Sequence, residues 1–338
     1  MLSRVAESLF WMGRQVERAE NIARIVDVNS QLLLDLPRPE SERIARNWLP
    51  VVACLGDETA FRERYKKADA GAVTEFLLFD RTHANSIVGS LAAARENART
   101  VREQISPEMW EQINRTYLWL MSKGARQFFE RNAYDFFQRV KKSLQLFQGI
   151  TDSVMMHGVG WEFLQMGRHL ERADKTSRLL DDEFFLVRKE NSPGGGALVQ
   201  WQAILRASNA RQSYQRIHAA VVDPMKVADL LLLHDEFPRS VEFCVRAVDE
   251  ALRRLSGVAP GRFSNCAEKL SGRLLSELSF SSIEEIWARG LHEVMDELQL
   301  KLNELGAAIL EVYMHPSTTP TAVAAAGSAT ASLPQVPQ

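Results

Sequence analysis

The sequence has few of the residue patterns that build well-known catalytic and metal sites. Its three cysteines, Cys54, Cys244 and Cys266, are far apart and form no C-x-x-C pair, which indicates a reducing compartment rather than a disulfide framework. The seven histidines form no H-E-x-x-H and no Glu-x-x-His pair of the di-iron type. A phosphate-binding Gly-x-x-x-x-Gly-Lys-Ser/Thr loop and a Gly-x-Ser-x-Gly nucleophile turn are also missing. We therefore expect no metal and no cofactor.

Neither sign of charge is in excess, and no apolar run is long. Lys and Arg number 41 against 43 Asp and Glu, for a net charge of −2, which predicts binding to neither nucleic acid nor anionic lipid. No apolar stretch approaches the roughly 20 residues that cross a bilayer. Residues 1–4 lead straight into an amphipathic pattern without the apolar core of a signal peptide. We expect a cytoplasmic protein.

Strand signals are scarce, whereas helical periodicity extends through most of the chain. Leu2, Val5, Leu9, Met12 and Val16 step by three and four residues, as on the buried side of a helix in a bundle. After residue 315 the composition shifts to Pro, Ser, Thr, Ala and Gly, which predicts a disordered tail over 316–338. The sequence therefore predicts an all-α protein with a disordered C-terminal tail.

An internal repeat organises this helical chain. When residues 10–27 are aligned without a gap with 164–181, eight of eighteen positions are identical and five of these eight are charged. The identical residues, each matched 154 positions further on, are Met12, Gly13, Arg14, Glu17, Arg18, Ala19, Arg24 and Asp27. Two helices of similar composition would match leucines and alanines instead. The repeat predicts two tandem, diverged helical bundles, 1–150 and 151–315, packed together.

The repeated Arg-x-x-Glu-Arg motif is the main candidate site. Its residues are Arg14, Glu17 and Arg18 in the first copy and Arg168, Glu171 and Arg172 in the second. Exposed charges would drift apart between copies, because a surface ion pair contributes only about 0–1 kcal/mol. One explanation is a buried ion-pair network, in which the glutamate beside each arginine supplies its anion. The other is a cleft between the copies, where the arginines bind a carboxylate or phosphate.

Two turns at equivalent places are weaker candidates. Arg81, His83 and Asn85 lie in the first turn, and His234 and Asp235 lie in the second. Each turn precedes a serine suited to begin a helix, so turn and capping roles are favoured over a binding site for these side chains.

The opening Leu2-Ser3-Arg4-Val5-Ala6-Glu7-Ser8-Leu9-Phe10-Trp11-Met12-Gly13-Arg14, continued by Glu17-Arg18-Ala19-Glu20-Asn21, resembles the start of the bacterial alpha-E family. The Glu-Arg pair at 171–172 and the segment 102–111 resemble that family too, so the likeness covers about residues 1–315. The resemblance implies a helical protein named for its Glu-Arg motif. It also implies genes for circularly permuted ATP-grasp proteins, transglutaminase-like proteins and, in some cases, proteasome-like peptidases nearby. It maps the motif onto the six residues above and supplies no catalytic residue.

Three functions fit these observations. The first is a non-catalytic accessory or scaffold protein of a system that forms peptide or amide bonds, with an ATP-grasp-type ligase and a transglutaminase-like protein as implied partners. The second is an enzyme or binding protein whose arginines hold an acidic or phosphorylated substrate, with Glu17 or Glu171 as general base. The third is a purely structural homo-oligomer. The absence of recognisable catalytic motifs favours the first.

Overall fold

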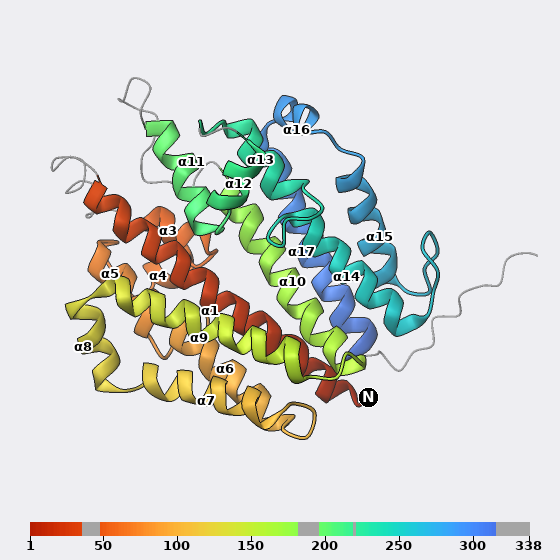
Figure 1. Cartoon of the computed structure of the whole chain (residues 1–338), viewed down its shortest axis with the longest axis horizontal. Coiled ribbons are helices and arrows are strands. Elements are labelled where there is room, and N and C mark those ends of the chain that lie inside the picture. The colour runs from red at the N-terminus through yellow and green to blue at the C-terminus, as the bar shows by residue number, and fades with distance from the viewer. Residues whose placement is uncertain (36–47, 182–195, 219–220, 316–338) are drawn as a thin grey trace, which may run out of the picture.

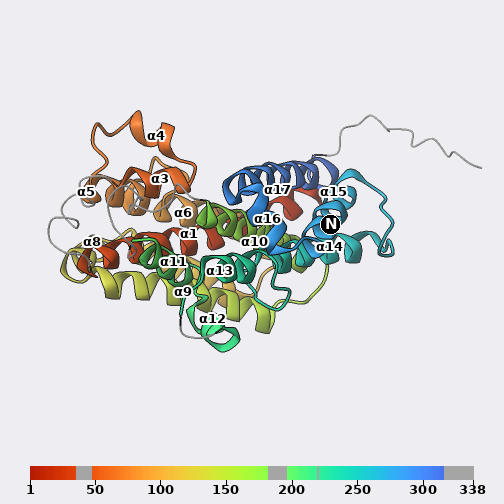
Figure 2. The same ribbon diagram turned by 90° about the horizontal axis from the view of Figure 1, so that it is seen from above.

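Two long helices form the centre of the molecule. The computed structural model describes residues 1–35, 48–181, 196–218 and 221–315, and every regular element within these ranges is helical, as predicted. Helix α1 (Ser3–Asp35) packs along α10 (Val159–Leu180), and the two lie between the other helices in both views (Figures 1 and 2). The tail predicted to be disordered, 316–338, lies outside the described residues.

The remaining helices of the first half surround α1. Helices α6 and α9 pack on α1, and α7 packs on both of them. The elements are α3 (Leu49–Cys54), α4 (Glu58–Arg62), α5 (Ala70–Thr74), the π-helix η1 (Glu75–Phe79), α6 (Ile87–Thr100), α7 (Pro107–Leu120), α8 (Lys123–Arg131) and α9 (Ala133–Val154).

The second half surrounds α10 in a similar way. Helices α14 and α17 pack on α10, and α15 packs on both of them. The elements are α11 (Gly196–Ala207), α12 (Arg211–Ile217), α13 (Pro224–Leu232), α14 (Val241–Ser256), α15 (Cys266–Ser279), α16 (Ile283–Arg289) and α17 (Leu291–Tyr313). Seen from above, α4 and α17 lie on one side of the central helices, and α9 and α12 lie on the other (Figure 2).

The turns before α6 and α14 have matching hydrogen bonds. The Ser86 hydroxyl accepts a hydrogen bond from the Gly89 N–H (2.9 Å) and donates to the Asp80 carbonyl (2.6 Å). The Ser240 hydroxyl accepts from the Phe243 N–H (3.0 Å) and donates to the His234 carbonyl (2.5 Å). Both serines are therefore N-caps, as predicted, and their partners are also 154 residues apart. The division into two repeats, 1–150 and 151–315, stays a prediction that these contacts support.

Two glycines let the central helices approach closely. A Cβ atom at Gly13 would overlap the carbonyl oxygen of Leu164, and one at Gly167 would overlap the carbonyl oxygen of Phe10. These obstacles are backbone atoms, which cannot move aside as a flexible side chain would. The glycines of the repeated motif therefore bring α1 and α10 into backbone contact, next to the charged residues.

Candidate functional site

The glutamate and second arginine of each motif copy pair with those of the other copy. Arg18 on α1 donates to both carboxylate oxygens of Glu171 on α10, from Nε (2.6 Å) and Nη2 (3.0 Å). Arg172 donates in the same way to Glu17, from Nε (2.9 Å) and Nη2 (2.8 Å). Two parallel charge-assisted bonds are the strongest arrangement that arginine and carboxylate make. The motif thus joins the two helices through a reciprocal exchange of ion pairs.

This pairing differs from the one that the sequence suggested. The glutamate beside each arginine was expected to be its anion, but adjacent residues on a helix point in directions about 100° apart and do not face each other. Glu17 therefore meets Arg172 instead of Arg18, and Glu171 meets Arg18 instead of Arg172.

Both motif glutamates are fully buried and held as anions. Burial alone would raise the pKa of Glu17, but the charges of Arg172 and Arg239 outweigh it and lower that pKa far below the usual range. For Glu171, burial is likewise outweighed by Arg18 and Arg14, and its pKa falls as far. A general base works best when its pKa lies near the working pH. These two carboxylates are therefore poorly suited to accept a proton.

The first turn extends the network on the α6 side. Arg14 donates from Nε to Glu171 (2.9 Å), and Arg18 donates from Nη1 to the side-chain oxygen of Asn85 (2.6 Å). The Asn85 amide donates in turn to Asp57 (2.7 Å), which also lies 3.3 Å from His83 Nε2. The structure thus brings Asn85 and His83 to the motif, together with Asp57.

The second turn contributes different residues from those that the sequence suggested. The Arg172 Nη1 donates to the Pro238 carbonyl (3.0 Å), and Arg239 donates to Glu17 (3.1 Å) and Glu20 (2.8 Å). The His234 carbonyl accepts a hydrogen bond from the Ser240 hydroxyl, and its Nδ1 accepts one from the Glu236 N–H. Asp235 is exposed. Neither of these two side chains has a contact with the motif among the described residues.

Sequence reasoning missed Arg239 and Asp57. Arg239 had a usable signal, because it stands immediately before the Ser240 cap, as Asn85 stands before the Ser86 cap. Its counterpart Asn85 was selected for that turn, so the 154-residue offset would have found Arg239 too. Asp57 carries no such signal, since it lies in a short loop between α3 and α4.

Arg168 does not pair with a motif glutamate. Its Nη1 donates a long hydrogen bond to the Gln165 side-chain oxygen (3.4 Å), and the same nitrogen lies 3.8 Å from the Asp152 carboxylate. Arg14, at the equivalent position, is paired to Glu171. The two copies are therefore not equivalent at this position.

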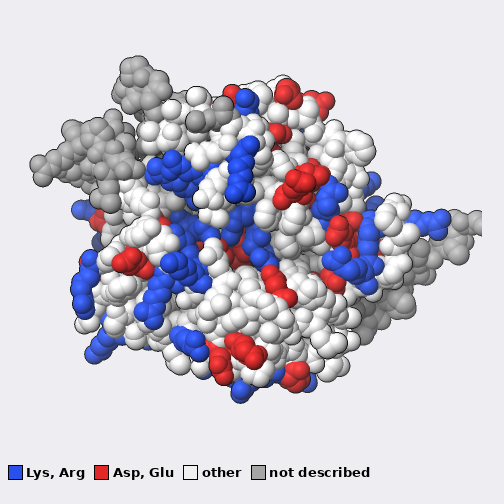
Figure 3. All heavy atoms as spheres, viewed as in Figure 1, with Lys and Arg blue, Asp and Glu red and all other residues white. Residues whose placement is uncertain are grey.

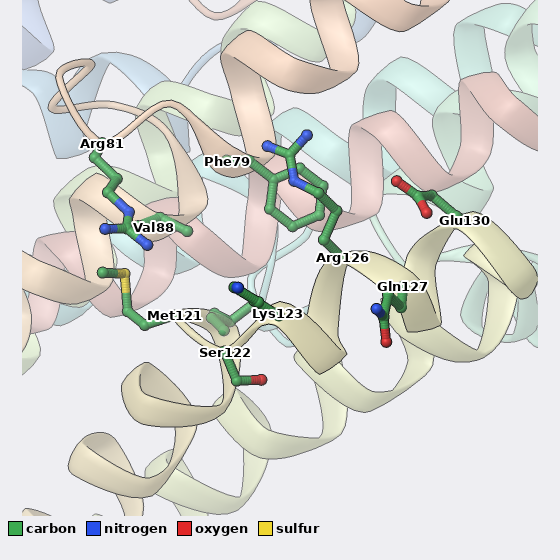
Figure 4. Close-up of a pocket in the computed structure, with 10 residues that line it drawn as sticks. Phe79, Arg81, Val88, Met121, Ser122, Lys123, Arg126, Gln127 and Glu130 are labelled. Atoms are coloured by element: carbon green, nitrogen blue, oxygen red, sulfur yellow. The ribbon is translucent and has the colours of Figure 1, made fainter.

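Arg81 belongs to a different surface. It lines a cavity of about 410 Å³ formed by residues of η1, α6, α7 and α8, together with Lys123 and Arg126 (Figure 4). Arg126 is already paired with Glu75 (2.6 Å) and lies over the Phe79 ring. The cavity contains no motif residue, so the structure does not bring Arg81 together with the candidate site.

One group of side chains in the described ranges has metal-ligand character. His292 Nδ1 lies 2.6 Å from Asp181, and its Nε2 lies 3.7 Å from Asp296. A hydrogen bond that the His292 ring donates to Asp181, and then the negative charge of Asp181, raise the pKa of His292. Asp181 matches Asp27, which pairs with Lys141 at 2.6 Å. An ion pair at both equivalent positions explains this group without a metal.

Comparison with known proteins finds one family model that matches most of the chain. The Alpha-E family model, described as a predicted alpha-helical domain with a conserved ER motif, matches residues 1–314. Uncharacterised proteins of Mycobacterium bovis and Mycobacterium tuberculosis are 26% identical over 313 residues, which cover 87% of this chain and 34% of theirs. The chain thus spans about a third of the length of these relatives. No solved structure matches. None of the helices in the described ranges is long and apolar enough to cross a membrane.

Proposed function

The chain belongs to the Alpha-E family, and from this membership and the buried motif we propose that it is a non-catalytic helical scaffold. The observation that carries the proposal is the exchange of ion pairs between α1 and α10. Each motif glutamate is sealed from solvent and bound by two nitrogens of an arginine from the other helix. A carboxylate held in this way fixes α1 against α10 and so contributes to the fold.

The same contacts argue against the rival role of Glu17 or Glu171 as a general base. A base must reach its substrate directly or through one water molecule. Both carboxylates are completely buried, and both have a strongly lowered pKa. Freeing either one would leave arginines buried without their anion, which costs about 3–5 kcal/mol.

We further propose that the scaffold serves an ATP-grasp-type ligase that forms peptide or amide bonds in the cytoplasm, with a transglutaminase-like protein as a second partner. This part rests on the family resemblance. The length of the relatives supports it, because their matching region is only 34% of a longer chain. A helical unit that is joined to further sequence in its relatives is suited to work beside other domains. The homo-oligomer is the alternative without a partner.

The test is reconstitution with an ATP-grasp ligase, whose gene the family resemblance implies to lie nearby. We expect the isolated chain to hydrolyse no ATP and to form no amide bond, because phosphoryl transfer needs phosphate-binding backbone or lysine donors and carboxylate-held Mg²⁺. We expect the ligase to co-purify with the chain at low micromolar concentration and to turn over ATP faster in its presence.

Two outcomes would contradict the proposal. One is ATPase or ligase activity in the isolated chain that disappears in a folded Arg14→Gln variant, which would make it an enzyme. The other is failure to bind the ligase, which would leave the homo-oligomer.

A further inference from the structure

Arg168 is a mostly buried cation whose nearest carboxylate, that of Asp152, lies 3.8 Å away. The position that it would occupy by analogy with Arg14 is beside Glu17, but the oxygens of Glu17 are taken by Arg172 and Arg239. The Arg168 side chain is only 17% exposed, and its Nε is buried without an acceptor in the described part of the chain. Buried N–H groups almost always have a partner, and a charged one left unpaired is especially costly.

Positive charge exceeds negative charge around Arg168. The guanidinium groups of Arg24, Arg168, Arg172 and Arg239 lie near the carboxylates of Glu17, Glu20 and Asp152, so four positive charges meet three negative ones. Burial and then the charge of Arg172 lower the pKa of Arg168, as burial lowers that of Arg239. The Asp152 carboxylate is half-exposed and lies 3.8 Å from Arg168, so it offsets only part of this positive charge.

The excess positive charge lies on the side of the central helices that α9 covers in part. Arg168 contacts Asp152 of α9, so the cluster lies on the side of α9, the face shown in Figure 3. On this face, Lys and Arg side chains gather near the middle, with acidic atoms between them (Figure 3). The Arg168 side chain keeps 17% of its surface exposed, so an anion can reach it from solvent.

Two glutamines, Gln165 next to Arg168 and Gln148 on α9, also have buried polar atoms without a partner among the described residues. Gln165 is 7% exposed, and its Nε2 has no acceptor, although its oxygen receives the long bond from Arg168. Gln148 is 5% exposed, and both polar atoms of its amide are unpaired among the described residues. It lies one turn before Asp152 on α9 and on the same face of that helix. Gln148 thus lies on the side of α9 from which Asp152 reaches Arg168.

We propose that Arg168, Gln165 and Gln148 form a binding site for an anionic group, a phosphate or a carboxylate. Such a group offers only oxygen acceptors, which the unpaired N–H groups lack, and its charge offsets the excess of arginine. A cation would be repelled by the same cluster. Arginine binds both kinds of anion through two parallel hydrogen bonds. This site is independent of the scaffold role, since its residues do not form the exchanged ion pairs.

Calorimetric titration of the whole chain with inorganic phosphate and with succinate tests the site. We expect saturable binding of at least one anion, weakened at least tenfold by Arg168→Gln and severalfold by Gln148→Leu. Tighter binding of phosphate would identify a phosphorylated ligand, and tighter binding of succinate would identify a carboxylate ligand. Arg115→Gln, at a residue on α7 with 73% of its side chain exposed, removes the same charge elsewhere and should bind like the wild type.

Thermal melting in anion-free buffer separates binding from folding. Arg168→Gln and Gln148→Leu should melt at or above the wild-type temperature, because each removes buried polar atoms that have no partner among the described residues. Lost binding would then be a local effect. The proposal is overturned if neither anion binds at millimolar concentration, if Arg168→Gln binds as well as the wild type, or if that variant melts several degrees lower. None of these results bears on association with the ligase.

Discussion

Replacing Glu17 with alanine should cost the fold about 3–5 kcal/mol, because it leaves a buried arginine without its anion. Glu17 is fully buried and accepts hydrogen bonds from two nitrogens of Arg172 and one of Arg239. Glu171→Ala should have a comparable effect through Arg14 and Arg18. Urea denaturation followed by far-UV circular dichroism measures both losses.

The matched control is Glu111→Ala, on the exposed side of α7. Glu111 has only a long contact with Arg115 (3.9 Å), so its removal should change the free energy of unfolding by no more than about 0.5 kcal/mol. If Glu17→Ala unfolds like Glu111→Ala while ligase binding is lost, the motif acts on a ligand and not on the fold.

Gly167→Ala should destabilise the protein by about 1–3 kcal/mol, the usual cost of forcing extra atoms into a packed interior. The new methyl group would overlap the Phe10 carbonyl, so α1 and α10 would have to move apart where their ion pairs form. In an unobstructed helix the same change is stabilising by about 0.5–1 kcal/mol, since alanine has less backbone freedom to lose. The sign of the effect therefore reports the helix contact directly.

Gly149→Ala on α9 is the control for this change. A Cβ atom at Gly149 would meet nothing within 4 Å, so this variant should gain the small stabilisation that alanine gives a helix. A gain of the same size in Gly167→Ala, measured by the same denaturation, would mean that the central helices are not in backbone contact.

Much of the fold was predictable because helices carry their own periodicity. The three- and four-residue steps from Leu2 to Val16 predicted α1, and the serine caps predicted where α6 and α14 begin. The π-helix η1 was not predicted, since its Glu-Phe-Leu-Leu-Phe sequence has no pattern that separates it from an α-helix.

The candidate site was only partly predictable because its contacts join distant segments. The repeat selected Arg18, Glu171, Arg172 and Glu17, which contact one another in the structure, but helical spacing alone could not pair them across α1 and α10. The same limit hid the difference between Arg14 and Arg168. Arg168 does not pair with Glu17 because Arg239 donates to that carboxylate. Arg239 lies in a turn more than 70 positions after Arg168, so helical spacing could not show this.

A double-mutant cycle between Glu17 and Arg172 tests the exchanged ion pair most directly. Glu17→Gln, Arg172→Met and the double variant, each unfolded in urea, give the coupling free energy of the pair without the cost of removing either side chain alone. We predict a coupling of about 1–3 kcal/mol, in the upper part of the range for residues in one network. A coupling within about 0.5 kcal/mol of zero, as for an exposed pair, would contradict the view that this motif holds the two helices together.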